Sequence, residues 1–114
     1  MSVNKIILIG NVGADPKVET LGSGAVVANL TLATTERGYT LQNGTTVPER
    51  TEWFNLVAWN GPAKLISSYV RKGSKLYVEG KVRTRTYDDQ NGIKRYITEV
   101  HIEQIDLLDK PANK

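Results

Sequence analysis

The chain contains no cysteine and only one histidine among its 114 residues. The absence of cysteine excludes disulfide bonds, a thiol nucleophile and every zinc site that depends on thiolate ligands. The one histidine, His101, has no second histidine to join it in a metal site. Glu99 and Glu103 stand two residues to either side of it, which favours a surface or interface position. We therefore expect neither a metal site nor another cofactor.

Long apolar runs are also missing. The N-terminal segment MSVNKIILIG is broken by Gly10 and Asn11 too early for a signal peptide, and no segment approaches the length of a membrane span. We therefore expect the protein in the cytoplasm. A length of 114 residues suits one domain with a small core.

Positive and negative charges nearly balance over the whole chain, but the basic residues are unevenly distributed. The net charge is +3. Between Lys64 and Tyr96, nine basic residues stand against three acidic ones, so this segment carries +6 and the rest of the chain −3. A local basic excess suits a polyanion-binding protein, because each neutralised phosphate releases condensed counterions. A solvated, lysine-rich strand edge would give the same count, so charge alone does not decide between the two.

The hydrophobic pattern predicts five strands and one helix. The strand-like segments are residues 3–9, 25–34, 50–59, 74–87 and 93–108. The segment NGPAKLISSYVRKG, after the third strand, has an apolar stripe at helical spacing that includes Tyr69 as a packing residue. We expect Asn60 or Gly61 to cap this helix, Pro62 to occupy its first turn and Gly73 to end it in a left-handed conformation.

The order of three strands, one helix and two strands is typical of one architecture. It indicates an all-β protein with a five-stranded oligonucleotide/oligosaccharide-binding (OB) barrel, with the helix between strands 3 and 4. This domain spans residues 1–108, and residues 109–114 form a short polar tail. A β-sandwich remains the alternative, because pattern alone does not determine topology.

Two details of the strands bear on function. In the fourth strand, Leu76, Val78, Gly80 and Val82 should face inward, and Gly80 should allow a bend or bulge. The polar segment 37–48 contains Asn-Gly, the commonest signal for a two-residue hairpin, and should protrude as a loop or hairpin. Because of its length, this segment is a candidate for function.

Aromatic residues share strand faces with polar ones. Trp53 and Trp59 lie on the same predicted face as Asn55, while the opposite face supplies Phe54, Leu56 and Ala58 for the core. A single tryptophan on a strand is more often part of the core. Two of them on the more polar face favour an exposed platform, and a base stacked on such a ring contributes roughly 1–3 kcal/mol whatever its identity.

The segment KVRTRTYDD combines basic and aromatic residues on one face. Lys81, Arg83 and Arg85 recur at about 6.6–6.8 Å along a strand, comparable to the repeat of an extended nucleic-acid backbone, and Tyr87 follows them. Tyr77 lies on the same outward face. Tyr39, in the predicted loop, could clamp a base or have no role. These positions favour a binding surface for single-stranded nucleic acid.

Catalysis is the poorer interpretation. Asp88 and Asp89 lie in a predicted turn, where aspartate is favoured for local hydrogen bonds to the backbone. The glycine-containing segments GNVGAD and LGSGA lack the Gly-Lys-Ser/Thr of a phosphate-binding loop. We therefore expect a protein that is not an enzyme. An OB module for protein assembly or oligosaccharide binding, without a nucleic-acid role, remains the alternative function.

Over nearly its whole length the chain resembles the DNA-binding domain of bacterial single-stranded DNA-binding proteins. The resemblance rests on VNKIILIGNVGADPKV, GAVVANLTLAT, TEWFNLVAWNG, YVRKGSKLYVEGKVRTRTYDD and NGIKRYITEV. It implies an OB barrel that assembles as a homotetramer and wraps single-stranded DNA without sequence specificity or catalysis. It further implies a role in DNA replication, recombination and repair, and a cytoplasmic, nucleoid-associated location.

The resemblance also assigns roles to individual residues. Trp53, Trp59 and Tyr87 match stacking positions, and Lys5, Lys72, Arg83 and Arg85 match basic positions along the phosphate path. Asn55 stands where some relatives have arginine, and the loop that carries Tyr39 does not align. The chain ends at KPANK in place of the family's acidic, Phe-ended tail, so we expect it to lack contacts with replication and repair proteins that depend on that tail.

Overall fold

The structure is a computed structural model that describes residues 1–109. Its elements are β1 (Ile6–Val12), β2 (Lys17–Thr20), β3 (Val26–Glu36), β4 (Tyr39–Thr40), β5 (Thr46–Val47), β6 (Arg50–Trp59), α1 (Gly61–Tyr69), β7 (Lys75–Asp88) and β8 (Lys94–Leu107). The predicted order of three long strands, one helix and two long strands is confirmed. The short strand β2 was not predicted. Apart from Asp109, the expected tail at 109–114 lies outside the described residues.

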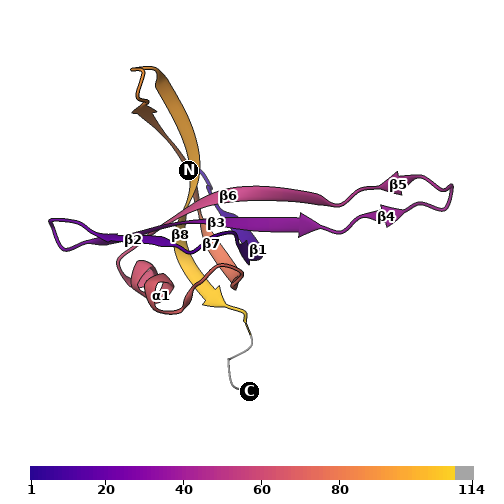
Figure 1. The fold of residues 1–114 in the computed structure, drawn as a ribbon, viewed down its shortest axis with the longest axis horizontal. Coiled ribbons are helices and arrows are strands. Elements are labelled where there is room, and N and C mark those ends of the chain that lie inside the picture. The colour runs from indigo at the N-terminus through magenta and orange to yellow at the C-terminus, as the bar shows by residue number, and fades with distance from the viewer. Residues whose placement is uncertain (110–114) are drawn as a thin grey trace.

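Strand pairing closes the sheet into a barrel. The strands follow the order β1, β7, β8, β6, β3 and β2, and β1 also pairs with β3. Five strands therefore form the wall, with β2 on the outer edge of β3 (Figure 1). All pairs are antiparallel except β6 with β8, which meet in parallel only at Leu56 with Val100 and Val57 with His101.

The core lies inside this barrel, because alternation along each strand directs every second side chain inward. The helix α1 covers one end of the barrel and packs against β3, β6 and β8 (Figure 1). The largest fully buried side chains are Leu32, Leu56, Ile66, Leu76, Val70 and Val78. No helix within residues 1–109 is long and apolar enough to span a membrane.

A bulge at Gly80 separates the barrel from a projecting arm. Gly80 pairs with Ile102 while Glu79 pairs with Gln104, so Glu103 is the extra residue on β8. A β-carbon at Gly80 would lie 2.3 Å from the His101 carbonyl oxygen, which explains why glycine is needed there. The predicted bulge is confirmed. Beyond it the strands leave the barrel, and Val82, expected to face inward, is 36% exposed.

Residues 81–99 form this first arm, the β7–β8 arm, and a second arm extends from β3 and β6 (Figure 1). The second arm ends in the β4–β5 hairpin, which confirms the predicted protruding hairpin at 37–48. Its turn differs from the expected two-residue type. Leu41 N–H donates to Thr45 O, Gly44 N–H donates to Leu41 O, and only Gly44 has a positive φ, 89°. This is a three-residue loop with a left-handed glycine.

The ends of α1 depart from expectation. Pro62 lies in the first turn as predicted, but the Asn60 side chain makes no capping hydrogen bond; its Oδ1 instead accepts from Val26 N–H at 3.2 Å. At the other end, Val70 is extended, so Gly73 (φ 90°) belongs to a later turn and does not cap the helix. Tyr69, expected to pack, is 67% exposed.

Candidate nucleic-acid interface

The two tryptophans of β6 are exposed on the outside of the barrel. Trp53 is 61% exposed and Trp59 is 44% exposed, and Asn55 between them is also exposed. Val57 shares their face but is buried, so this part of the outer surface is covered by neighbouring side chains. The two residues are six positions apart along the strand, which corresponds to about 20 Å between their backbones.

The position of Trp53 depends on a glycine that the sequence pattern did not single out. A β-carbon built on Gly13 would lie 2.4 Å from Trp53 Cζ3 and 2.9 Å from Thr31 Oγ1. The indole ring therefore lies directly over the Gly13 backbone, which follows β1. The motif GNVGADP signalled only a turn, whereas the structure shows that its second glycine makes room for the ring.

Lys72 lies near this end of the interface. Its backbone N–H donates to Asp15 Oδ1 at 2.8 Å, and the adjacent Gly73 N–H donates to Val12 O at 2.8 Å. These bonds join the turn after α1 to the segment that carries Gly13 beneath Trp53. The Lys72 side chain is exposed and forms no ion pair with any residue in 1–109.

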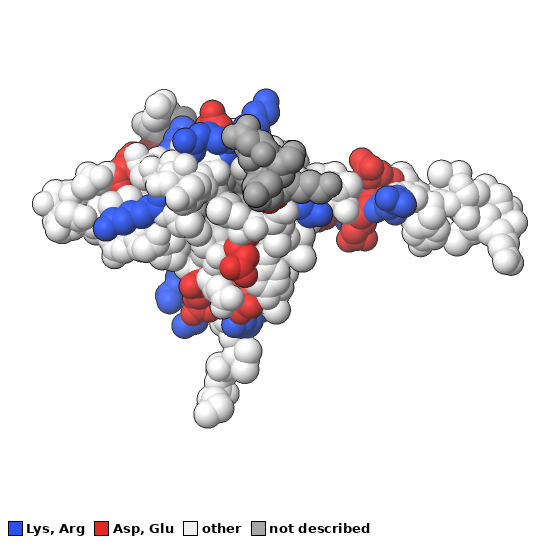
Figure 2. Space-filling view, turned by 90° about the horizontal axis from the view of Figure 1, so that it is seen from below, with Lys and Arg blue, Asp and Glu red and all other residues white. Residues whose placement is uncertain are grey.

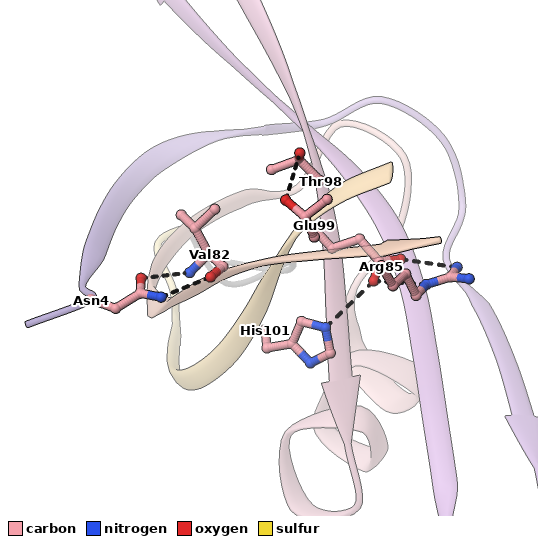
Figure 3. A network of polar contacts seen from close by, with 7 residues as sticks. Asn4, Val82, Arg85, Thr98, Glu99 and His101 are labelled. Atoms are coloured by element: carbon pink, nitrogen blue, oxygen red, sulfur yellow. Dashed lines mark hydrogen bonds and ion pairs between the residues drawn. The ribbon is translucent and has the colours of Figure 1, made fainter. Parts of the chain in front are cut away.

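Two of the three basic residues predicted on β7 already have a carboxylate partner within the protein. Arg85 donates from Nε and Nη2 to the two carboxylate oxygens of Glu99, at 3.0 and 3.2 Å (Figure 3). Lys81 Nζ lies 3.5 Å from Glu103 Oε2. Arg83 stands opposite Glu99 in the strand register but makes no ion pair within the described part of the chain.

The Glu99 carboxylate is approached by both Arg85 and His101, and this position was not predicted as part of the site. Its side chain is only 4% exposed, and His101 Nε2 approaches the same carboxylate at 3.4 Å (Figure 3). The carboxylate raises the pKa of Arg85, first by hydrogen bonding and then by its charge. The side chain of His101 is 28% exposed, so the expected surface position is only partly realised.

Two shallow grooves, one beside each tryptophan, share Glu99 as a lining residue. One groove is lined by Trp53 together with Asn55 on β6 and Thr98 on β8. The other is lined by Trp59 together with Arg85. Glu99 lines both, so the two grooves adjoin at this carboxylate, and the second groove also contains the Arg85 side chain.

The N-terminal segment is attached to the base of the β7–β8 arm. Asn4 Nδ2 donates to Val82 O at 2.8 Å, and Val82 N–H donates to Asn4 Oδ1 at 2.9 Å (Figure 3). The next residue, Lys5, lies 2.7 Å from Glu79 Oε1, and Tyr77 donates its hydroxyl hydrogen bond to Glu79 Oε2 at 2.5 Å. The bond to Glu79 is the main reason that the pKa values of Lys5 and Tyr77 are raised.

Tyr87 and Tyr39 lie away from the barrel, one on each arm. Tyr87, 46% exposed, is on the Arg85 face of β7, and Tyr39, 58% exposed, is on β4. Tyr96, on β8 in the same arm, is 70% exposed. It is exposed because the arm has left the barrel at that point. The far end of the β4–β5 hairpin carries no charged residue (Figure 2).

The turn at the end of the β7–β8 arm confirms the interpretation of Asp89 as a structural residue. Asp89 Oδ1 accepts from Asn91 N–H and Ile93 N–H, both at 2.9 Å, and Arg95 Nε donates to Oδ2 at 2.9 Å. These bonds, that from Ile93 first, lower the pKa of Asp89. Within residues 1–109, no group of three or more potential metal ligands is present.

Comparison with known proteins identifies relatives along the whole chain. The model of the single-strand binding protein family matches residues 3–108. A protein named single-stranded DNA-binding protein from Bacteroides thetaiotaomicron is 59% identical over 114 residues, which cover 99% of this chain and 71% of that protein. A solved structure described as Plasmodium falciparum SSB complex with ssDNA superposes with a TM-score of 0.85 at 34% identity, covering 96% of this chain and 97% of the other. The barrel is therefore the predicted OB fold.

Proposed function

The chain belongs to the single-strand binding protein family, and we propose that it binds single-stranded DNA without sequence specificity. Its family is one of DNA-binding proteins that are not enzymes. The exposure of both Trp53 and Trp59 on one face of the barrel, each beside a groove, is the single observation that carries this proposal. Unpaired bases present aromatic faces, and an exposed indole stacks on any of them.

Each residue predicted for the site has a proposed role. Trp53, Trp59, Tyr87 and Tyr39 stack bases, and Lys5, Lys72, Lys81, Arg83 and Arg85 contact phosphates. The basic residues fall into two classes. Arg83 and Lys72 are available at once, whereas the other three must exchange a carboxylate partner for a phosphate. We therefore expect the second class to contribute less affinity per charge.

We also propose that the protein acts as a homotetramer. The outer side of β1 presents Ile7 and Ile9, which are 57% and 51% exposed, beside the half-buried Tyr77. A second copy of the chain would remove this apolar strip from water. Sedimentation equilibrium measures the assembly directly. Ile7→Lys with Ile9→Lys should lower the molar mass, and the distant control Leu41→Lys should not.

The wider role proposed is the protection and organisation of single strands during DNA replication, recombination and repair. Residues 1–108 act as the DNA-binding domain, and residues 109–114 form a tail. The proposed location is the cytoplasm, in association with the nucleoid. Replication and repair proteins are proposed partners at such strands.

A fluorescence titration tests the central proposal. Oligo(dT) is added to the protein at several salt concentrations while tryptophan emission is recorded. Stacking should quench the emission, and affinity should fall as salt rises, because phosphate binding releases counterions. Duplex DNA and a neutral oligosaccharide are the matched ligand controls. Equal binding of duplex, or absence of both quenching and salt dependence, would contradict the proposal.

A further inference from the structure

Asn60 has an unusual backbone conformation at the start of α1. Among residues 1–109 it is the one residue other than glycine with a positive φ. Its angles, φ 52° and ψ −110°, are close to those of the first central residue in a type II′ turn, a position normally occupied by glycine. A β-carbon is strained there. Because Gly61 follows, the strained residue is the first half of an Asn-Gly dipeptide.

The ψ angle decides whether the reacting atoms of such a dipeptide can meet. In succinimide formation, the glycine nitrogen attacks Cγ of the preceding asparagine. The Cβ of an L-residue is offset by about 120° from its own nitrogen around the Cα–C bond. A ψ of −110° therefore brings the Cα–Cβ bond of Asn60 nearly into the plane of the next peptide, on the side of the Gly61 nitrogen. The backbone already has the shape that the cyclic imide requires.

Hydrogen bonding at Asn60 favours the same reaction. The bond from Val26 N–H to Oδ1 polarises the side-chain carbonyl and stabilises negative charge on that oxygen. The Gly61 N–H belongs to the first turn of α1, where helices leave such groups without internal partners. Neither it nor Asn60 Nδ2 has a hydrogen bond within the described residues, and both residues are exposed to water.

We propose that Asn60-Gly61 is a site of spontaneous succinimide formation and deamidation that the fold promotes. The Gly61 nitrogen forms a bond to Asn60 Cγ, the Cγ–Nδ2 bond breaks, and the proton from the Gly61 N–H leaves with ammonia. Water then opens the imide at either carbonyl, which leaves an aspartyl or isoaspartyl residue at position 60. Water is the only other reactant. The new negative charge stands next to Trp59, so modification should weaken DNA binding, a consequence that rests on the proposed function.

Two other Asn-Gly dipeptides serve as internal controls. In Asn43-Gly44 and Asn91-Gly92, the glycine N–H groups donate to Leu41 O at 2.9 Å and to Asp89 O at 3.0 Å. Both asparagines occupy the third position of a turn without a positive φ, which corresponds to type I and a ψ of about 0°. That ψ turns Cβ away from the glycine nitrogen, so the fold should protect these two sites.

Peptide mapping by mass spectrometry tests the proposal without using DNA. The protein is incubated at mildly alkaline pH, both native and unfolded in urea, and loss of ammonia and isoaspartate are followed at all three dipeptides. In the native protein, position 60 should react several-fold faster than positions 43 and 91. In urea the three rates should be similar. A native rate at position 60 no higher than the others, or the same preference in urea, would overturn the proposal.

Two variants sharpen the test. A β-carbon at Gly61 meets no atom within 4 Å, so Gly61→Ala should fold normally but slow ring closure by crowding the nucleophile. Its rate at position 60 should fall several-fold, while the rates at positions 43 and 91 stay unchanged. Asn60→Gly suits the positive φ and removes the amide, so it should abolish the modification. An unchanged rate in Gly61→Ala would exclude attack by the Gly61 nitrogen.

Discussion

Replacing Glu99 with glutamine should strengthen the binding of single-stranded DNA. The carboxylate holds Arg85 through two hydrogen bonds and lies between the grooves that lead to Trp53 and Trp59. Glutamine has nearly the same shape but no charge. It therefore releases the guanidinium for a phosphate and removes a negative charge from the proposed DNA path.

The expected gain in DNA affinity can be estimated from the removal of one negative charge beside the proposed DNA path. Loss of one repulsive charge close to a phosphate should raise affinity by roughly three- to tenfold at low salt. If Arg85 then contacts one further phosphate, the slope of log K against log salt should steepen by about 0.7. The thermal midpoint should fall by no more than a few degrees, because the Arg85 side chain is 58% exposed and stays hydrated.

Oligo(dT) titrations at several salt concentrations measure affinity and slope together. Glu103→Gln is the matched control, because Glu103 is 44% exposed and its contact with Lys81 is longer, 3.5 Å. It should change affinity less than Glu99→Gln does. A fall in affinity for Glu99→Gln, with an unchanged slope, would refute the reasoning and would mean that Glu99 orients Arg85 for phosphate binding.

Three further predictions concern other parts of the interface. Gly13→Ala should displace the Trp53 ring and reduce affinity for oligo(dT) nearly as much as Trp53→Ala, a loss of about 1–3 kcal/mol, while stability changes little; normal quenching would contradict this. Tyr39→Ala should weaken binding to long oligonucleotides more than to short ones, because Tyr39 lies on an arm away from the barrel, and equal losses would be inconsistent with its proposed role. Since the pKa of Asp89 is lowered in the folded protein, its stabilising effect is present above its ordinary value of 3.8 and is lost as pH falls through the lower, folded value. The protection of the Ile93 amide against exchange, measured relative to its intrinsic rate at each pH, should therefore fall in that acid range, and Asp89→Asn should remove this pH dependence; an identical acid profile in Asp89→Asn would rule out the assignment.

Features that depend on strand periodicity were predictable from the sequence. The shared face of Trp53 and Trp59 follows from a spacing of two residues per repeat, and the structure leaves both exposed. Gly80 marked the bulge because glycine inside a strand pattern permits a close backbone approach. The apolar stripe that became α1 and the protruding hairpin at 37–48 also came from local pattern.

Features that depend on contacts between distant segments were not predictable. Val82 was assigned to the inward face by alternation, which does not reveal where a strand pair leaves the barrel. Tyr69 has the spacing of a core residue, yet it is 67% exposed. The motif that contains Gly13 gave no sign of the indole ring above it, because Trp53 is distant in sequence.

The sequence by itself determined which charged residues share a strand face, and only the tertiary structure decided which of them have an ion-pair partner. Alternation in β7 and β8 places Arg83, Arg85 and Glu99 on one face of the strand pair, because side-chain direction is a local property of a strand. The register places Arg83 directly opposite Glu99, yet in the folded protein the carboxylate pairs with Arg85, and Arg83 has no ion pair in the described residues. Ion pairing depends on atoms that meet only when the barrel closes, so the charge available to DNA is a property of the fold.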